Sequence, residues 1–225
     1  GITPSLAGFK EGKGLESRTR QNALFLSVVA QFNGKVALSI QTWFSERLKT
    51  ISGLDDDGYK AFTMKQCEDE QSRSSILKFV KAMDVGIEDL SISKRPPMEA
   101  IPAEFPAELR KVLLGSGENE ISRVGTVHRR FDAAGQEIGR EAFDFEQHES
   151  EGTKKIFALA GPIIDTLENG RVLIVDELDA RLHPLITAAL IRLFNDADSN
   201  KKRAQLLFTT HDINILQTDL LRRDQ

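Results

Sequence analysis

The sequence predicts an α/β protein with a parallel β-sheet at its centre, and three observations carry this prediction. Residues 172–175, Val-Leu-Ile-Val, form a continuous apolar run, which is typical of a strand buried on both faces of a sheet. Apolar side chains at helical spacing follow over 186–194, and a second apolar strand follows over 205–209. A strand, a helix and a strand in this order indicate two parallel strands joined by a crossover helix.

The elements before this unit are mostly helical. Apolar residues from Phe25 to Trp43 recur at helical spacing and predict one long helix from Asn22 to about Lys49, with a weak point at Asn33-Gly34. Residues 52–72 have the composition of a loop and a polar helix. A second amphipathic helix has an apolar face, and a strand follows it. The face consists of Ile76, Phe79, Val80 and Met83, and the strand spans Ile87–Ile92.

A β-hairpin and a further helix lead into the parallel sheet. The hairpin is predicted over 122–131 and 137–145, on either side of Asp132-Ala-Ala-Gly135. The helix spans about 150–169, with apolar residues from Ile156 to Leu167 on one face, and Asn169-Gly170 closes it. Four of the seven prolines lie over 96–106, and 107–114 has the pattern of a short helix. We therefore divide the chain into a helical arm (1–95), a linker (96–121) and a C-terminal lobe (122–225).

Composition excludes several classes of protein. The 225 residues carry a formal net charge of −4, which excludes a globally basic nucleic-acid clamp. Cys67 is the single cysteine, so an internal disulfide and a cysteine-rich zinc site are excluded, and a reducing, cytoplasmic compartment fits. The longest apolar stretch, Ala23 to Phe32, is too short to cross a bilayer, and no signal peptide precedes it. We expect no membrane partner.

The acids Asp176 and Glu177 follow the first predicted strand of the parallel sheet directly. Two neighbouring carboxylates at the carboxyl edge of a sheet repel each other, and a divalent cation relieves that repulsion. Open α/β sheets bind their ligands at this edge. In P-loop nucleotide hydrolases the first acid holds Mg²⁺, and a second acid can polarise the attacking water. The alternative is an ordinary buried strand followed by a solvated helix start.

Two further groups are expected near these acids. The second strand ends in Thr210-His211-Asp212, and an imidazole at the sheet edge can bond a γ-phosphate. Ser150-Glu151-Gly152-Thr153 opens the preceding helix, whose N-terminus suits phosphate, and Gly152 would allow a close approach of the backbone. Alternatively, Ser150 is a plain N-cap and His211 a capping or core histidine.

Together these residues resemble the ABC-type ATPase superfamily, and they follow one another in the order of that family's motifs. Ser150-x-Gly152 resembles the signature loop, Asp176-Glu177 the Walker B pair, Leu178-Asp179 the D-loop and His211 the switch histidine. The resemblance implies a P-loop NTPase core of the ABC type, incomplete in this chain, with a helical arm insertion and a β-hairpin.

The resemblance also implies a role for each residue. ATP would lie between two such heads in a homodimer. Asp176 would hold Mg²⁺ through water, Glu177 would orient and deprotonate the attacking water, and His211 would contact the γ-phosphate. The residues facing the partner head's nucleotide or the dimer interface would be Ser150, Gly152, Thr153 and Asp179.

Longer runs are closest to one branch of this superfamily. Residues 149–155, 176–184, 208–212 and 20–33 resemble the RecF/OLD-like AAA ATPases, closest to the RloA/AbiL-type proteins of bacterial restriction-linked and abortive-infection loci. This implies a role in anti-phage defence, with an effector nuclease as a candidate partner. Glu149 stands where the general ABC pattern has leucine, and Glu151 adds an acid close to the expected γ-phosphate.

The phosphate-binding Walker A loop is missing from the sequence. Residues 8–14 come nearest to its Gly-x-x-x-x-Gly-Lys-Ser/Thr motif, but their glycine spacing is one residue short, and Gly14 stands where Ser or Thr binds Mg²⁺. We therefore expect the chain to be the C-terminal half of an ATPase, inactive by itself. Its start at Gly1 rather than Met agrees with that expectation.

Other groups of residues support functional predictions only weakly. Asp55-Asp56-Asp57-Gly58 lacks the acid spacing of a calcium loop and is a solvated turn by pattern. His128-Arg129-Arg130, Lys201-Lys202-Arg203 and Arg222-Arg223 could contact nucleic-acid phosphates, although solvated faces also explain them. The alternative function is a non-catalytic module whose arm and hairpin recruit a nuclease or sense a phage component.

Overall fold

The computed structural model describes residues 9–95, 121–217 and 220–221. Its centre is a three-stranded sheet in the order β1-β5-β6, in which all neighbouring strands are parallel. The strands are β1 (Leu48–Ser52), β5 (Val172–Asp176) and β6 (Gln205–Phe208). Helix α9 (Pro184–Asn195) forms the crossover between β5 and β6. The predicted α/β class with a parallel sheet is therefore confirmed.

Strand β1 is an element that the sequence pattern did not predict. It pairs with β5 from Leu48 opposite Val172 to Ser52 opposite Asp176. Its sequence, Leu-Lys-Thr-Ile-Ser, is short and half polar, and it follows a helix without a break in the apolar pattern. Because β1 lies at the sheet edge, two intermediate residues, Leu48 and Ile51, are enough to anchor it.

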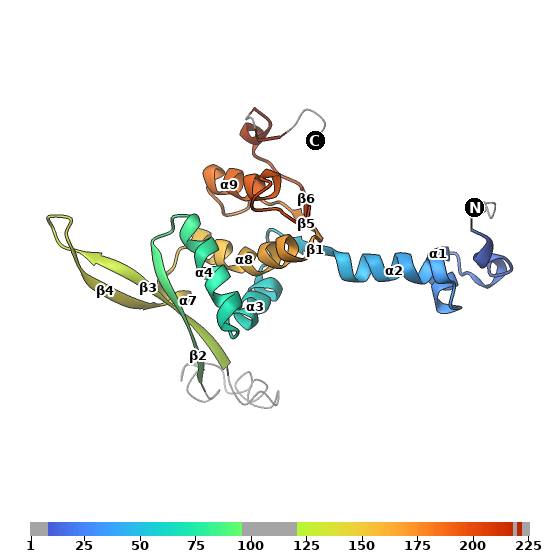
Figure 1. Cartoon of the computed structure of the whole chain (residues 1–225), viewed down its shortest axis with the longest axis horizontal. Coiled ribbons are helices and arrows are strands. Elements are labelled where there is room, and N and C mark those ends of the chain that lie inside the picture. Colours follow the sequence, from blue (N-terminus) through green and yellow to red (C-terminus); the bar gives the residue numbers. More distant parts are fainter. Residues whose placement is uncertain (1–8, 96–120, 218–219, 222–225) are drawn as a thin grey trace.

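The predicted long helix of the arm is wrong as a single element, because it breaks at the weak point. Helix α1 (Phe25–Gln31) ends before Asn33, which adopts a left-handed φ of 62°, and α2 (Lys35–Arg47) starts after Gly34. The carboxylate of Glu11 then caps α2 by accepting hydrogen bonds from two backbone N–H groups, those of Val36 (3.1 Å) and Ala37 (2.7 Å). The arm extends away from the sheet (Figure 1).

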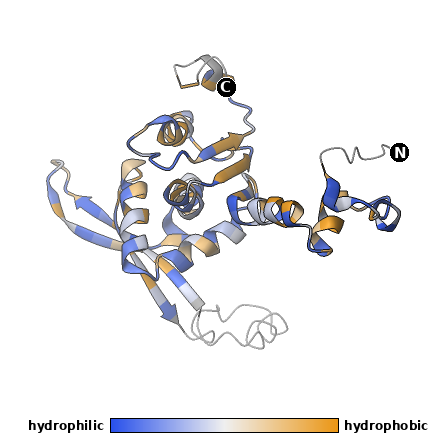
Figure 2. Cartoon of the chain, turned by 45° about the vertical axis from the view of Figure 1, so that its right-hand side comes forward, coloured by the Kyte–Doolittle hydropathy of each residue, from blue (hydrophilic) through white to orange (hydrophobic). Residues whose placement is uncertain are grey.

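Three helices form the main core below the sheet. Helices α3 (Asp57–Gln66) and α4 (Glu70–Ala82) pack on α8 (Glu151–Asn169). The predicted apolar face of α4 is buried in this core. Figure 2 shows that hydrophobic residues concentrate in the parallel sheet, whereas the β3–β4 hairpin is largely hydrophilic. The buried residues of the α4 face are Ile76, Phe79, Val80 and Met83.

A second sheet is antiparallel, with the order β2-β3-β4. It contains β2 (Ile87–Arg95), β3 (Ile121–Phe131) and β4 (Glu137–Asp144), so the predicted strand and hairpin are both confirmed. Asp132 Oδ1 stabilises the turn by accepting hydrogen bonds from the N–H groups of Ala134 and Gln136. The short helix α7 (Phe145–His148) joins this sheet to α8.

The remaining elements are short. The 3-10 helices are Lys10–Gly12, Glu16–Arg18 and Ile213–Gln217. The predicted helix over 107–114 and most of the linker lie outside the described residues. The division into arm, linker and lobe stays a prediction, and β1 and α3, which we had assigned to the arm, contact β5 and α8 of the lobe. Among the helices that the structure describes, none is both long enough and apolar enough to cross a membrane.

Helix α8 contains a proline that α3 makes tolerable. Pro162 has no N–H, so the carbonyl of Ala158, four residues earlier, lacks its helical donor. The hydroxyl of Thr63 donates to that carbonyl at 2.8 Å, and it accepts from the N–H of Gly161 at 3.1 Å. A Cβ on Gly161 would lie 2.5 Å from Thr63 Oγ1. The close packing of α3 on α8 therefore depends on one hydroxyl and one glycine.

We predict that Thr63→Val destabilises the protein by about 1–3 kcal/mol, because it leaves a buried carbonyl without a donor. Chemical denaturation followed by circular dichroism measures the loss. Thr63→Ser, which keeps the hydroxyl, is the matched control and should stay much closer to wild type. Equal stability of the valine and serine variants would contradict this account of the α3–α8 contact.

Candidate functional site

The carboxyl ends of β5 and β6 bring the predicted acids together around Thr209. The Thr209 hydroxyl donates to Asp176 Oδ1 at 2.6 Å and accepts from the N–H of Glu177 at 2.7 Å. Glu177 has a left-handed φ of 56°, which turns the chain sharply after the strand. The backbone N–H of Leu178 donates to the Thr209 carbonyl at 3.0 Å. Both acids are thus held at the sheet edge by one threonine, which the sequence analysis had not assigned a role.

His211 and Asp179 lie at the same edge. His211 Nε2 is 3.6 Å from Glu177 Oε1, and the imidazole is 81% exposed. The backbone N–H of His211 donates to Asp179 Oδ1 at 3.2 Å. Burial acts to raise the pKa of Asp179, but hydrogen bonds from Thr210 and from the backbone outweigh it and hold that pKa below its ordinary value. The four predicted residues Asp176, Glu177, Asp179 and His211 therefore form one cluster.

The Ser150 turn forms a second group. Ser150 is the N-cap of α8, and its Oγ accepts from the N–H of Thr153 at 3.1 Å. A Cβ on Gly152 would lie 3.3 Å from the backbone oxygen of Arg181, so the turn packs closely on the chain just beyond Asp179. Within the described ranges, no hydrogen bond or ion pair joins Ser150, Gly152 or Thr153 to the four-residue cluster. The structure gives Ser150 the geometry of an N-cap, as the alternative reading anticipated.

Glu149, the residue that departs from the general ABC pattern, points into the protein. Its carboxylate is 7% exposed and accepts a hydrogen bond from Thr126 Oγ1 at 2.5 Å. The same carboxylate oxygen lies 2.6 Å from His128 Nε2. Strand β3 therefore anchors the residue directly before the Ser150 turn. The acid ties the antiparallel sheet to α8 and does not face the expected phosphate.

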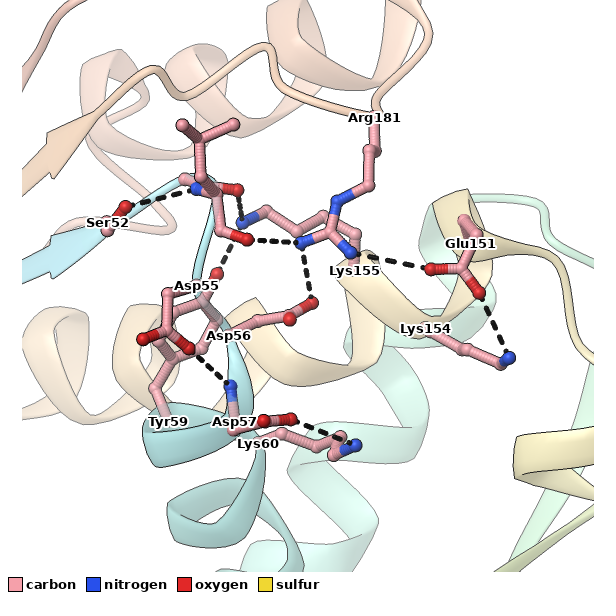
Figure 3. A network of polar contacts seen from close by, with 12 residues as sticks. Ser52, Asp55, Asp56, Asp57, Tyr59, Lys60, Glu151, Lys154, Lys155 and Arg181 are labelled. Carbon is pink, nitrogen blue, oxygen red and sulfur yellow. Dashed lines mark hydrogen bonds and ion pairs between the residues drawn. The ribbon is translucent and has the colours of Figure 1, made fainter.

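Arg181 connects the two groups, and sequence reasoning missed it (Figure 3). Its guanidinium contacts Asp56 Oδ2 at 3.0 Å, the carbonyl of Leu54 at 3.2 Å and Glu151 Oε2 at 3.4 Å. Arg181 itself has a left-handed φ of 62°. The loops after β1 and β5 and the first turn of α8 therefore meet at one cation. Lys154 and Arg181 both contact the Glu151 carboxylate and lower its pKa, and Lys154 has the larger effect.

Lys155 is fully buried beneath this junction. Its ammonium donates to the carbonyl of Gly53 at 2.5 Å and to the hydroxyl of Tyr59 (Figure 3). Burial is the largest cause of its pKa falling to about 8, and the nearby carboxylate of Asp56 opposes this fall. Burial also raises the pKa of Tyr59 above its ordinary range. The signal was present in the sequence, because Lys155 is four residues before Leu159 on the apolar face of α8.

Gly53 places the end of β1 directly against the two acids. Its N–H donates to the Asp176 carbonyl at 2.5 Å. A Cβ at this position would lie 2.6 Å from the Asp176 backbone oxygen and closer still to that of Glu177. Any side chain here would displace the backbone that carries both acids. The glycine is therefore required by close approach of two chains rather than by a positive φ.

The cluster has the ligand chemistry of a hydrated cation site. The residues that the structure describes contain no group of three His, Cys, Asp or Glu side chains able to hold a metal. Mg²⁺, however, keeps several waters and binds one or two carboxylates together with substrate phosphates. Asp176 uses Oδ1 for Thr209, and Oδ2 takes part in no hydrogen bond with the described residues. This donor set fits Mg²⁺ held mainly through water.

A comparison with models of protein families identifies the family to which the chain belongs. The family model described as "AAA domain, putative AbiEii toxin, Type IV TA system" matches residues 6–217. The chain belongs to this family. It is an AAA domain, an ATPase-like nucleotide-binding module, and the sheet edge with its acids lies inside the matched range. No curated protein matches the chain, and no solved structure does.

Residues 9–14, the described part of the segment 8–14 that we rejected as a phosphate loop, lie at the far end of the arm (Figure 1). Its described part, Phe9–Gly14, contains the 3-10 helix Lys10–Gly12. Phe9 packs against Phe25 with ring centroids 6.0 Å apart. The one carboxylate in it, Glu11, caps α2 as described above. These contacts give the segment a structural role in the AAA domain's arm.

We predict that Gly53→Ala destabilises the AAA domain by about 2 kcal/mol or more, because the methyl group overlaps backbone atoms that cannot rotate away. Gly58→Ala is the matched control, since a Cβ there meets nothing within 4 Å and alanine favours the helix. Thermal unfolding of both variants measures the difference. If the two variants unfold at the same temperature, β1 and β5 do not approach as closely as described.

A second prediction concerns pH. The unfolded chain keeps a proton on Lys155 up to about pH 10.5, whereas the folded chain releases it near pH 8. Between these values the unfolded state binds more protons, so this group makes stability rise with pH. Compared with Lys155→Met, the wild type should gain about 1.5 kcal/mol of unfolding free energy from pH 8 to 9.5.

The pH experiment has an internal limit and a control. Above about pH 10 the raised pKa of Tyr59 works in the opposite direction, so the measurement stays below that value. Lys65→Met removes an exposed lysine from α3 and should show no pH-dependent difference from wild type. A wild-type advantage that is constant over the whole range would mean that Lys155 stays protonated in the folded protein.

Proposed function

We propose that this AAA domain is the ATP-hydrolysing part of an ATPase whose nucleotide lies between two heads. The observation that carries the proposal is the meeting of Glu177 and His211, 3.6 Å apart, beside Asp176 at the carboxyl edge of a parallel sheet. This edge is where open α/β sheets bind ligands. A carboxylate at such a position can accept a hydrogen bond from an attacking water, and an imidazole can donate a hydrogen bond to a phosphate oxygen.

Each residue of the cluster would have a distinct role. Asp176 would hold Mg²⁺ through water, and Mg²⁺ would neutralise charge that develops on the phosphates. Glu177 would orient the attacking water and accept its proton. His211, whose exposed imidazole faces Glu177, would donate a hydrogen bond to the γ-phosphate. Thr209 would keep Asp176 and the backbone of Glu177 in position through its two hydrogen bonds.

We further propose that the Ser150 turn and Asp179 serve the nucleotide of the partner head in a homodimer. Helix α8 has 19 residues, and its first N–H groups and dipole favour an anion. Gly152 has no side chain, and this allows the turn to pack on the backbone of Arg181, where a Cβ would lie 3.3 Å from the Arg181 oxygen. Because the Ser150 hydroxyl caps the helix through Thr153, the backbone N–H groups of the turn would provide most of the contact. Arg181 would link the two half-sites of one chain.

We also propose which branch of the ATPases the protein belongs to and in which process it acts. The motif runs support a RecF/OLD-like ATPase, closest to the RloA/AbiL-type proteins, acting in the cytoplasm in bacterial anti-phage defence with an effector nuclease. The family description, with its AbiEii toxin and Type IV toxin–antitoxin system, supports a setting of this kind. A nucleic-acid role for His128-Arg129-Arg130 has less support, because His128 contacts Glu149 and Arg129 pairs with Glu88 at 2.8 Å.

The second candidate function is a non-catalytic interaction module. It is favoured by the arm and the hairpin, which both project from the central layers (Figure 1). Under this alternative the sheet-edge acids would be a solvated strand end. ATP with Mg²⁺ would then neither drive dimerisation of the full protein nor be hydrolysed by it.

We predict that Glu177→Gln in the full protein keeps ATP binding but slows ATP hydrolysis about 10²-fold or more, the usual scale for a lost general base. Phosphate release and binding of a labelled ATP analogue measure the two properties separately. Glu168→Gln, which changes an exposed acid on α8, is the control and should leave both unchanged. The 225-residue chain alone should bind ATP weakly, because its sequence contains no Walker A motif.

Wild-type turnover by Glu177→Gln would remove the proposed role of that residue. Wild-type protein that shows neither ATP-dependent dimerisation nor phosphate release would favour the interaction module instead.

A further inference from the structure

The outer edge of β1 is an unpaired strand edge beside a hollow of about 440 Å³. In the described part of the chain, β1 pairs on one side only, with β5. The hollow lies between this edge and the helices α3 and α8. Tyr59 and Phe62 of α3 line one side, and Pro162 of α8 lines another. The β1 residues that line it are Lys49, Thr50, Ile51 and Ser52.

The hydrogen-bond register shows which backbone groups of β1 are open. The N–H of Gly53 donates to the Asp176 carbonyl, so Gly53 faces β5. Peptide groups of successive residues in a strand point to opposite sides, so Ile51 also faces β5, whereas Thr50 and Ser52 present their N–H and C=O groups to the outer edge. Both residues are exposed, as an open edge requires. Two donors and two acceptors therefore line the hollow in strand geometry.

The edge carries little of the protection that proteins place on such strands. Charged side chains, proline and bulges are the usual means of blocking an edge. Here β1 has one lysine, Lys49, whose ammonium lies 5.9 Å from the ring centroid of Phe62. It has no proline, and its pairing with β5 is regular from Leu48 to Ser52.

The charges at the two ends of the hollow differ in sign. Lys49 lies at the start of β1, and Asp55, an exposed acid, lies just after its end. Asp165 also lines the hollow, but Arg171 and Asn169 already bind its carboxylate. An occupant with an acidic group at one end and a basic group at the other therefore matches the hollow.

We propose that the β1 edge and its hollow bind an extended peptide as a fourth strand of the parallel sheet. The peptide backbone would pair with Thr50 and Ser52, and an apolar side chain would contact Phe62 and Pro162. A basic residue of the peptide would lie near Asp55. This mode gives affinity through main-chain hydrogen bonds and selectivity through alternate side chains. The proposal does not depend on nucleotide hydrolysis, because the outer edge of β1 lies on the side of that strand away from β5 and its acids.

The test uses the full protein without nucleotide and two fluorescein-labelled, end-capped peptides. One has the sequence Glu-Val-Thr-Val-Thr-Val-Lys, and the other has this sequence reversed, so that either strand direction can match the charges. Fluorescence anisotropy should show that at least one peptide binds with a Kd of about 100 μM or tighter. A copy of that peptide with a methyl group on every backbone nitrogen has no N–H to pair on either edge and should bind at least about tenfold more weakly.

Variants of the protein locate the contact. Thr50→Pro removes an N–H from the outer edge only and should weaken binding at least about tenfold. Asp55→Lys should weaken binding of the selected peptide several-fold, while Asp198→Lys, an exposed acid outside the hollow, should not. Circular dichroism checks that each variant is folded. If Thr50→Pro does not fold, the N-methylated peptide decides the question without it.

Three results would overturn the proposal. The first is that neither peptide binds. The second is equal binding of the N-methylated peptide, which would make the hollow an apolar site without strand pairing. The third is a self-association of the protein that Thr50→Pro abolishes without any peptide, which would assign the edge to a second copy of the chain. Peptide binding is measured without nucleotide, so these outcomes would stand even if the wild-type protein released no phosphate or if Glu177→Gln turned over ATP at the wild-type rate.

Discussion

The structure depends on the contact between the end of β1 and the end of β5 at Gly53. The N–H of this glycine binds the Asp176 carbonyl, and its own carbonyl accepts the buried ammonium of Lys155. A charged amine out of water is costly unless its hydrogen bonds are made, so Lys155 constrains both Gly53 and Tyr59 strongly. Through its N–H and its carbonyl, this one residue thereby links the sheet, α8 and α3.

The cluster of acids follows from this contact. Because Gly53 has no side chain, the backbone of Glu177 can make its left-handed turn directly beside the end of β1. Thr209 then holds Asp176 and Glu177 from the other side, through β6. The candidate site is therefore a product of three adjacent strand ends.

Two further contacts make the surroundings of the site into one connected structure. Arg181 joins the loops that follow β1 and β5 to the first turn of α8. Glu149 joins that first turn to the antiparallel sheet through Thr126 and His128. A displacement of the Ser150 turn would therefore strain these contacts with the loop after Asp176-Glu177 and with the antiparallel sheet. These contacts form a continuous path of hydrogen bonds and ion pairs from the loop after β5 to the antiparallel sheet.

The sequence by itself determined the elements whose signal is local. The apolar run 172–175 identified the central strand, and the apolar spacing over 186–194 identified its crossover helix. The residues Asp132-Ala-Ala-Gly135 identified the hairpin turn. Each of these signals depends only on residues that are neighbours in the sequence. Only the tertiary structure decided the rest. Strand β1 is short and half polar, and it becomes a strand because β5 offers it a partner. Arg181 and Gly53 carry no local signal of their roles, since each acts on residues more than 100 positions away. Lys155 is visible as a lysine on an apolar helix face, but its partners Gly53 and Tyr59 lie about 100 positions away. The direction of Glu149, inward to β3, likewise depends on a contact between two sheets that no pattern within one segment can encode.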